Sequence, residues 1–112
     1  MTITIQKEKL EHVDEKIILL NVIGCLEAVK NGGITIEEAE KFIFSPHMIE
    51  KLKTKGCNDK IVELISKGCE LEDIVSLIPQ ELEKVLEEMK QEAIEIVKEY
   101  EPIDEMFWVE DV

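Results

Sequence analysis

The chain has 112 residues, of which 45% are apolar and 35% are charged, a balance typical of one globular domain rather than of a disordered chain. It holds 26 acidic residues and 13 lysines, without arginine, for a net charge of −13. Because proteins bind nucleic acids by neutralising phosphates with lysine and arginine, this charge excludes a nucleic-acid partner. No apolar run approaches the roughly 20 residues that cross a bilayer, so a membrane protein is excluded as well.

The sequence predicts an all-α fold, a compact bundle of five or six helices with long first and last helices. The alternation in residues 2–6 is typical of a short strand or an extended arm. The first helix is expected over residues 7–30. Its middle, IILLNVIGCL (residues 17–26), is apolar on nearly every side, which predicts a buried central helix in which Asn21 needs a hydrogen-bond partner.

Capping residues mark the helices that follow. Thr35 and Glu38 form a capping box for a helix that reaches about residue 44. Ser45, followed by Pro46, is expected to begin a helix that ends near residue 55, and Asn58 one that ends near residue 68. The later elements are an apolar set formed by Leu71, Ile74, Val75, Leu77 and Ile78, and a last amphipathic helix over residues 79–100.

Two Gly-Cys steps, Gly56-Cys57 and Gly68-Cys69, separate these helices. Each predicts the end of a helix at the glycine and a small apolar side chain at the cysteine. The three cysteines lack the closely paired spacing of a zinc site. Packed thiols are therefore favoured over a redox pair of Cys57 and Cys69.

The sequence shows no pattern typical of catalysis. His12 and His47 lie far apart, neither follows a glutamate at the spacing of a helical metal site, and no glycine-rich phosphate loop occurs. We therefore expect no enzyme activity, no catalytic residue, no metal and no cofactor. A thiol enzyme that pairs a cysteine with His47 is the alternative.

Negative charge gathers in the C-terminal half, where residues 61–112 hold sixteen acidic residues and four lysines. Five glutamates of the last expected helix fall within about 60° of one another at 100° per residue, whereas Lys84, Lys90 and Lys98 are expected to point elsewhere. We name these five residues the glutamate ridge: Glu81, Glu88, Glu92, Glu95 and Glu99. Like charges at this spacing repel, so the ridge indicates a docking face for a cationic partner, and a merely solvated face is the alternative.

Residues 101–112 are expected to form an acidic aromatic tail, in which residues 106–109 are an apolar plug. One interpretation is that the plug folds back on the core, pairing with residues 2–6 as a two-stranded terminal ribbon. The other is that Phe107 and Trp108 bind the partner as an anchor, because tryptophan is enriched at binding hot spots.

The segments LLNVIGCLEAVKNGGITIEEAEKFIFSP (residues 19–46) and GCELEDIVSLIP (residues 68–79) resemble an uncharacterised bacterial family of small all-helical proteins, a domain of unknown function. The similarity covers most of residues 17–100. Because these motifs consist of apolar and capping residues, the resemblance implies a fold and no catalytic site. In size and acidity the chain is also similar to toxin immunity proteins, a class that neutralises basic toxins by charge complementarity.

Taken together, these observations predict a single helical domain, residues 1–112, that is a non-enzymatic acidic binding protein for a basic protein partner, in an immunity or antitoxin role. The start MTITIQKEK lacks the basic and apolar stretches of a signal peptide, so a cytoplasmic location is expected. A structural or regulatory homodimer formed through residues 82–100 is the alternative.

Overall fold

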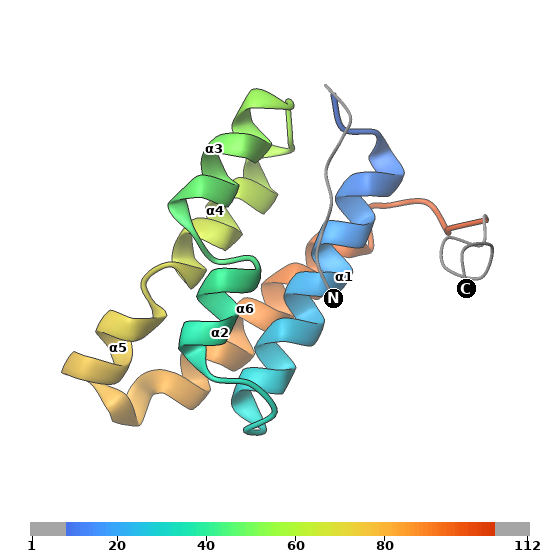
Figure 1. Ribbon diagram of the computed structural model, residues 1–112. Coiled ribbons are helices and arrows are strands. Elements are labelled where there is room, and N and C mark those ends of the chain that lie inside the picture. The colour runs from blue at the N-terminus through green and yellow to red at the C-terminus, as the bar shows by residue number, and fades with distance from the viewer. Residues whose placement is uncertain (1–8, 105–112) are drawn as a thin grey trace.

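The computed structural model describes residues 9–104, and over that range the chain is all-helical and compact, with no strand (Figure 1). The terminal ribbon predicted for residues 2–6 and 106–109 lies outside the described residues. Four helices are longer than seven residues, namely α1, α3, α4 and α6. The elements in chain order are α1 (His12–Lys30), α2 (Ile36–Phe42), α3 (Pro46–Thr54), α4 (Asp59–Gly68), α5 (Leu71–Leu77), the 3-10 turn η1 (Pro79–Glu81) and α6 (Leu82–Val97).

The two longest helices, α1 and α6, pack side by side and form the centre of the fold (Figure 1). They run antiparallel, because α1 residues from 15 to 30 meet α6-side residues from 100 down to 87. Each helix buries a stripe of apolar residues at intervals of three and four, as an amphipathic helix does. The stripes are Ile18, Leu19, Val22, Cys25 and Leu26 on α1, and Leu86, Met89, Ala93 and Ile96 on α6.

The middle of α1, predicted as a buried central helix, is buried along one stripe and exposed elsewhere. Leu20 is 46% exposed and Gly24 is exposed, because the other described helices cover only part of the surface of α1. Asn21 is half-buried, and its amide nitrogen donates to the Ile17 carbonyl at 2.9 Å. The polar partner that Asn21 requires is therefore supplied by its own helix.

Polar contacts tie one end of the α1–α6 pair to the start of α4. The Glu15 carboxylate accepts hydrogen bonds from the Tyr100 hydroxyl at 2.9 Å and from the Asn58 backbone N–H at 2.7 Å. The His12 ring stacks on Tyr100 with 4.2 Å between ring centroids. Burial, together with the Glu15 charge, raises the pKa of Tyr100 well above its ordinary value, so the hydroxyl stays a donor.

Ion pairs tie the other end of the α1–α6 pair. The Lys90 ammonium lies 2.7 Å from Glu27 and 3.0 Å from Glu87, and Lys30 lies 3.0 Å from Glu87. Hydrogen bonds from Lys30 and Lys90 lower the pKa of Glu87 to about 2. The same contacts lower the pKa of Glu27 and raise the pKa of Lys90.

Thr35, Ser45 and Asn58 are confirmed as N-caps, although only the half of the predicted capping box in which Thr35 accepts is present. The Thr35 hydroxyl accepts from the Glu38 N–H at 3.0 Å, and the Ser45 hydroxyl accepts from the Met48 N–H at 3.1 Å. The Asn58 side chain accepts from the Lys60 N–H at 2.9 Å. Gly56 has a φ of 74°, a left-handed conformation that lets the chain turn from α3 into α4.

At the second Gly-Cys step α4 ends at Gly68, as predicted, but Gly68 does not adopt a left-handed backbone. Cys69 and Glu70 keep right-handed conformations, with φ of −67° and −96°. Gly68 is buried against the Phe44 ring, and a Cβ at this position would overlap the ring. The glycine is therefore required for close packing of α4 on Phe44 rather than for a turn.

Replacing Gly68 by alanine should lower the free energy of unfolding by about 1–3 kcal/mol, because the buried Phe44 ring must move to admit the methyl group. The matched control is Gly24→Ala in α1, where a Cβ meets no atom within 4 Å and where alanine should stabilise the helix by about 0.5–1 kcal/mol. Urea unfolding of both variants measures the difference. Equal effects at the two positions would contradict this account of Gly68.

Replacing Lys90 by methionine should lower the melting temperature by several degrees at pH 7, because Glu27 and Glu87 lose their shared cation. The pKa values of both carboxyls are lowered in the fold, so their contribution is present above the ordinary value near 4.5 and is lost as the pH falls toward about 2. The difference in melting temperature between wild type and variant should accordingly narrow as the pH falls from 5 to 3 and close only near pH 2. Lys84→Met is the control, because Lys84 lies 4.0 Å from Glu88 on the exposed face of α6 and should change the melting temperature little.

Candidate functional site

The glutamate ridge is not one continuous helical row. Glu88, Glu92 and Glu95 lie on α6, but Glu81 belongs to the 3-10 turn η1 and Glu99 follows the last residue of α6. The backbone N–H of Glu99 donates to the Ile96 carbonyl at 3.0 Å, as in a tightened last turn. The change of helical geometry at both ends displaces Glu81 and Glu99 from the angular positions that a uniform helix predicts.

Four of the five ridge glutamates lie beside lysines. Within α6 and its last turn, Glu88 meets Lys84 at 4.0 Å and Glu95 meets Lys98 at 2.9 Å. The expectation that Lys84 and Lys98 point away from the ridge is therefore wrong, because their long side chains reach neighbours three and four residues away.

Two further pairs join the ridge to α4. Glu92 meets Lys67 at 2.9 Å, and Glu99 meets Lys60 at 3.4 Å. Lys90 does point away from the ridge, toward Glu27 and Glu87. Glu81 forms no ion pair with any residue in the range 9–104.

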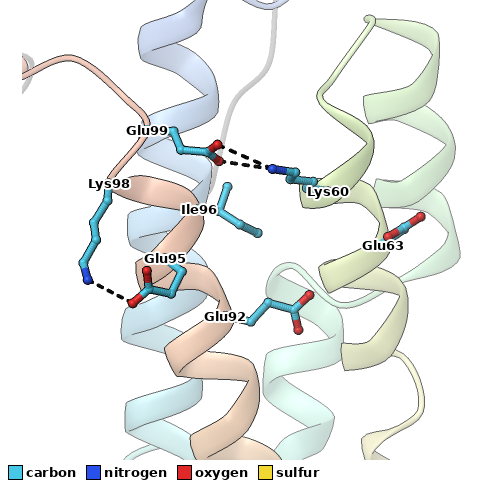
Figure 2. Close-up of a pocket in the computed structure, with 7 residues that line it drawn as sticks. All are labelled: Lys60, Glu63, Glu92, Glu95, Ile96, Lys98 and Glu99. Atoms are coloured by element: carbon cyan, nitrogen blue, oxygen red, sulfur yellow. Dashed lines mark hydrogen bonds and ion pairs between the residues drawn. The ribbon is translucent and has the colours of Figure 1, made fainter.

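A surface pocket of about 610 Å³ lies between α4 and α6 beside these ion pairs (Figure 2). Figure 2 shows Lys60 reaching across from α4 to Glu99, while Lys98 turns back to Glu95. Three of the four glutamates that line the pocket are paired with lysines, and Glu63 is the exception among the described residues. The lining residues are Lys60, Glu63, Glu92, Glu95, Ile96, Lys98 and Glu99.

The surroundings of the three cysteines disfavour the thiolate form. Burial raises the pKa of Cys25 to about 11, and burial together with the Glu15 carboxylate raises the pKa of Cys57 to about 12. The pKa of Cys69 is raised by the same causes, burial first and then nearby carboxylates. Because the thiolate is the nucleophile, these shifts suppress thiol chemistry at neutral pH.

A redox pair of Cys57 and Cys69 does not fit the structure, because the two residues flank opposite ends of α4. Ten helical residues span about 15 Å, far more than the separation a disulfide bridges. No set of three or more His, Cys, Asp or Glu side chains among residues 9–104 is arranged to hold a metal ion. In the same range, no helix has both the length and the apolar character needed to cross a membrane.

Five acidic residues without a lysine partner among residues 9–104 lie on or next to α2, α5 and η1, a region that the sequence analysis did not select. Glu40 on α2 faces Glu72 and Asp73 on α5. Burial and the charges of Glu72, Glu37 and Asp73 raise the pKa of Glu40. We name the following residues the acidic corner, and none of them forms an ion pair within the described part of the chain: Glu40, Glu70, Glu72, Asp73 and Glu81.

An exposed apolar surface adjoins the acidic corner. Val75 is 39% exposed, Leu77 79% and Ile78 43%. The sequence analysis grouped these residues with Leu71 and Ile74 as one apolar set, and the structure buries only part of that set. Leu71 alone is fully buried, with Ile74 half-buried beside it, because the short helix α5 packs through its first turn and then leaves the core.

Phe107 and Trp108, the predicted anchor, lie outside the described residues, as does the rest of the plug. The residues that the structure brings together are therefore Glu92, Glu95 and Glu99 at the pocket, with Glu88 farther along α6. Glu81 lies apart from them, next to α5.

Residues 8–110 match a family model described as a protein of unknown function (DUF3969), and the chain belongs to this family. The resemblance predicted from residues 19–46 and 68–79, to an uncharacterised family, is thereby confirmed. Neither the curated proteins nor the solved structures gave a match.

Replacing Glu40 by glutamine should raise the melting temperature by about 1–3 °C at pH 7, because it removes a carboxylate that Glu72 and Asp73 repel. The pKa of Glu40 is raised in the fold, so its ionisation costs stability above the ordinary value and costs nothing at pH values below it. The gain should therefore vanish in thermal unfolding near pH 3 and shrink at high salt. Glu50→Gln, an exposed acid of α3, is the control, and an equal gain there would contradict the repulsion.

Proposed function

We propose that this protein is an acidic binding protein without catalytic activity, which engages a basic protein partner. The observation that carries the proposal is the acidic corner, where five carboxylates of α2, α5 and η1 have no lysine partner while the lysines of α4 and α6 are paired elsewhere. A basic partner supplies the missing positive charge and relieves the repulsion at Glu40, so association gains energy that the chain cannot gain within itself.

The net charge of −13 supports the same partner class through long-range attraction. Surplus charge of one sign raises the association rate with a partner of the opposite sign, and salt screens this effect. The glutamate ridge adds to this field. At direct contact Glu88, Glu92, Glu95 and Glu99 contribute less, because a partner must first displace their lysines. Phe107 and Trp108 stay the predicted anchor.

An immunity or antitoxin role in the cytoplasm is one form of this activity, since small acidic proteins can mask the cationic surface of a toxin. The alternative, a structural or regulatory homodimer, has less support. The apolar side of α6 that would form its seam is already buried against the rest of the chain, at Leu86, Met89, Ala93 and Ile96. Two copies also carry the same net charge and repel each other at low salt.

Affinity capture from extracts of the source cells, followed by mass spectrometry, tests the proposal. Wild type should retain a protein of basic isoelectric point at low salt and release it as salt rises. The variant Glu72→Lys/Asp73→Lys should lose the partner, whereas Glu88→Lys/Glu92→Lys/Glu95→Lys should weaken retention less, because those glutamates are paired in wild type. Both variants should keep the wild-type melting temperature within a few degrees.

Retention of an acidic protein, or retention that salt does not change, would overturn the proposal. A doubled mass in light scattering that becomes more populated as salt rises would favour the homodimer instead, because screening removes the repulsion between copies.

A further inference from the structure

The turn from α5 into η1 exposes an uncharged run of six consecutive residues, Val75–Gln80, which we name the α5 tip. Leu77 is 79% exposed, more than any other large apolar residue of the described chain. Figure 1 shows α5 and this turn projecting at one corner of the molecule. Consecutive exposed apolar residues add nothing to the fold and favour association, so their usual explanation in a soluble domain is a binding surface.

Acidic side chains flank the α5 tip along the chain. Leu77 follows Asp73 by four residues and Val75 follows Glu72 by three, spacings that place each pair on one side of a helix. Glu81 follows the tip directly, and Glu40 on α2 lies close enough to Glu72 and Asp73 for their charges to raise its pKa. The surface therefore combines an apolar centre with an unpaired acidic border.

We propose that the α5 tip and the acidic corner together are the contact site for a basic amphipathic helix of the partner. Its apolar side chains cover Val75, Leu77 and Ile78, and its lysines or arginines pair with Glu72, Asp73 and Glu40. Three exposed apolar side chains match one or two turns of such a helix, whose anchors recur at three and four positions. This inference rests on the proposed function and adds the place and the chemistry of the contact.

Charge selects this occupant over two others. A second copy of this chain, related by a two-fold axis, would bring two acidic corners toward each other. The tail of the same chain carries Glu105, Glu110 and Asp111 beside its apolar plug, so its charge has the same sign as the border. A cationic helix is the occupant that complements both the apolar centre and the carboxylates.

The experiment uses two synthetic peptides as probes and the full-length isotope-labelled protein. One peptide has leucine and lysine at helical spacing, and the other carries serine in place of every leucine, with unchanged charge. NMR shift mapping locates the contact, and fluorescence anisotropy gives the affinity. The leucine peptide should shift the amides of residues 70–81 and bind at least about tenfold more tightly than the serine peptide.

The double variant Leu77→Ser/Ile78→Ser should lower the affinity for the leucine peptide about tenfold. The control variant Leu20→Ser, which alters another exposed leucine, should leave that affinity unchanged. Glu72→Gln/Asp73→Gln should weaken both peptides and reduce the salt dependence of binding. All these side chains are exposed, and a wild-type melting temperature for each variant confirms that it folds.

Chemical-shift changes centred on the pocket between α4 and α6, or on α1, would show that the α5 tip is not the contact site. The proposal of a basic partner would still stand in that case. Equal affinity for the two peptides would overturn the apolar contact. If the chemical shifts of the same amides change with protein concentration in the absence of peptide, the surface binds a second copy of the chain. Failure of the proposed function would be seen in a different experiment, because affinity capture would then retain no basic protein.

Discussion

The antiparallel pairing of α1 with α6 is the constraint on which the rest of the structure depends. Apolar stripes alone allow two helices to slide along each other by a turn, but polar contacts at both ends of this pair oppose such a shift. Glu15 accepts from Tyr100 and Asn58 at one end, and Lys90 bridges two carboxylates at the other. A shifted register would leave these groups unpaired, and removing a partner from a partly buried polar group is costly.

This use of lysines for internal contacts determines where negative charge stays uncompensated. Lys30 and Lys90 hold α1 against α6, and Lys60 and Lys67 hold α4 against the C-terminal part of α6. None of these lysines pairs with the five carboxylates of the acidic corner around α5. The acidic corner therefore stays uncompensated within the described residues, and the exposed α5 tip lies next to it.

The sequence predicted best the features that depend on neighbours along the chain. Caps at Thr35, Ser45 and Asn58 follow from local hydrogen bonds, and the stripe of α6 follows from helical periodicity. Features that depend on distant residues were missed. Gly68 ends α4 as predicted, but its close contact with the Phe44 ring is not visible in the sequence. A lysine's partner likewise depends on which helix packs alongside. The run Glu70–Asp73 was a visible signal for the acidic corner, but the unpaired state of its charges appears only in three dimensions.

The buried thiols give this fold an internal set of reporters. A thiol with a raised pKa inside the core reacts with an alkylating reagent only when its surroundings open, so its labelling rate measures a local opening equilibrium. Cys25 lies on the central helix, Cys57 at the junction of α3 and α4, and Cys69 at the joint between α4 and α5. Three regions of the bundle thus carry native probes of their own stability, and the half-buried Cys69 reads the joint that carries the α5 tip.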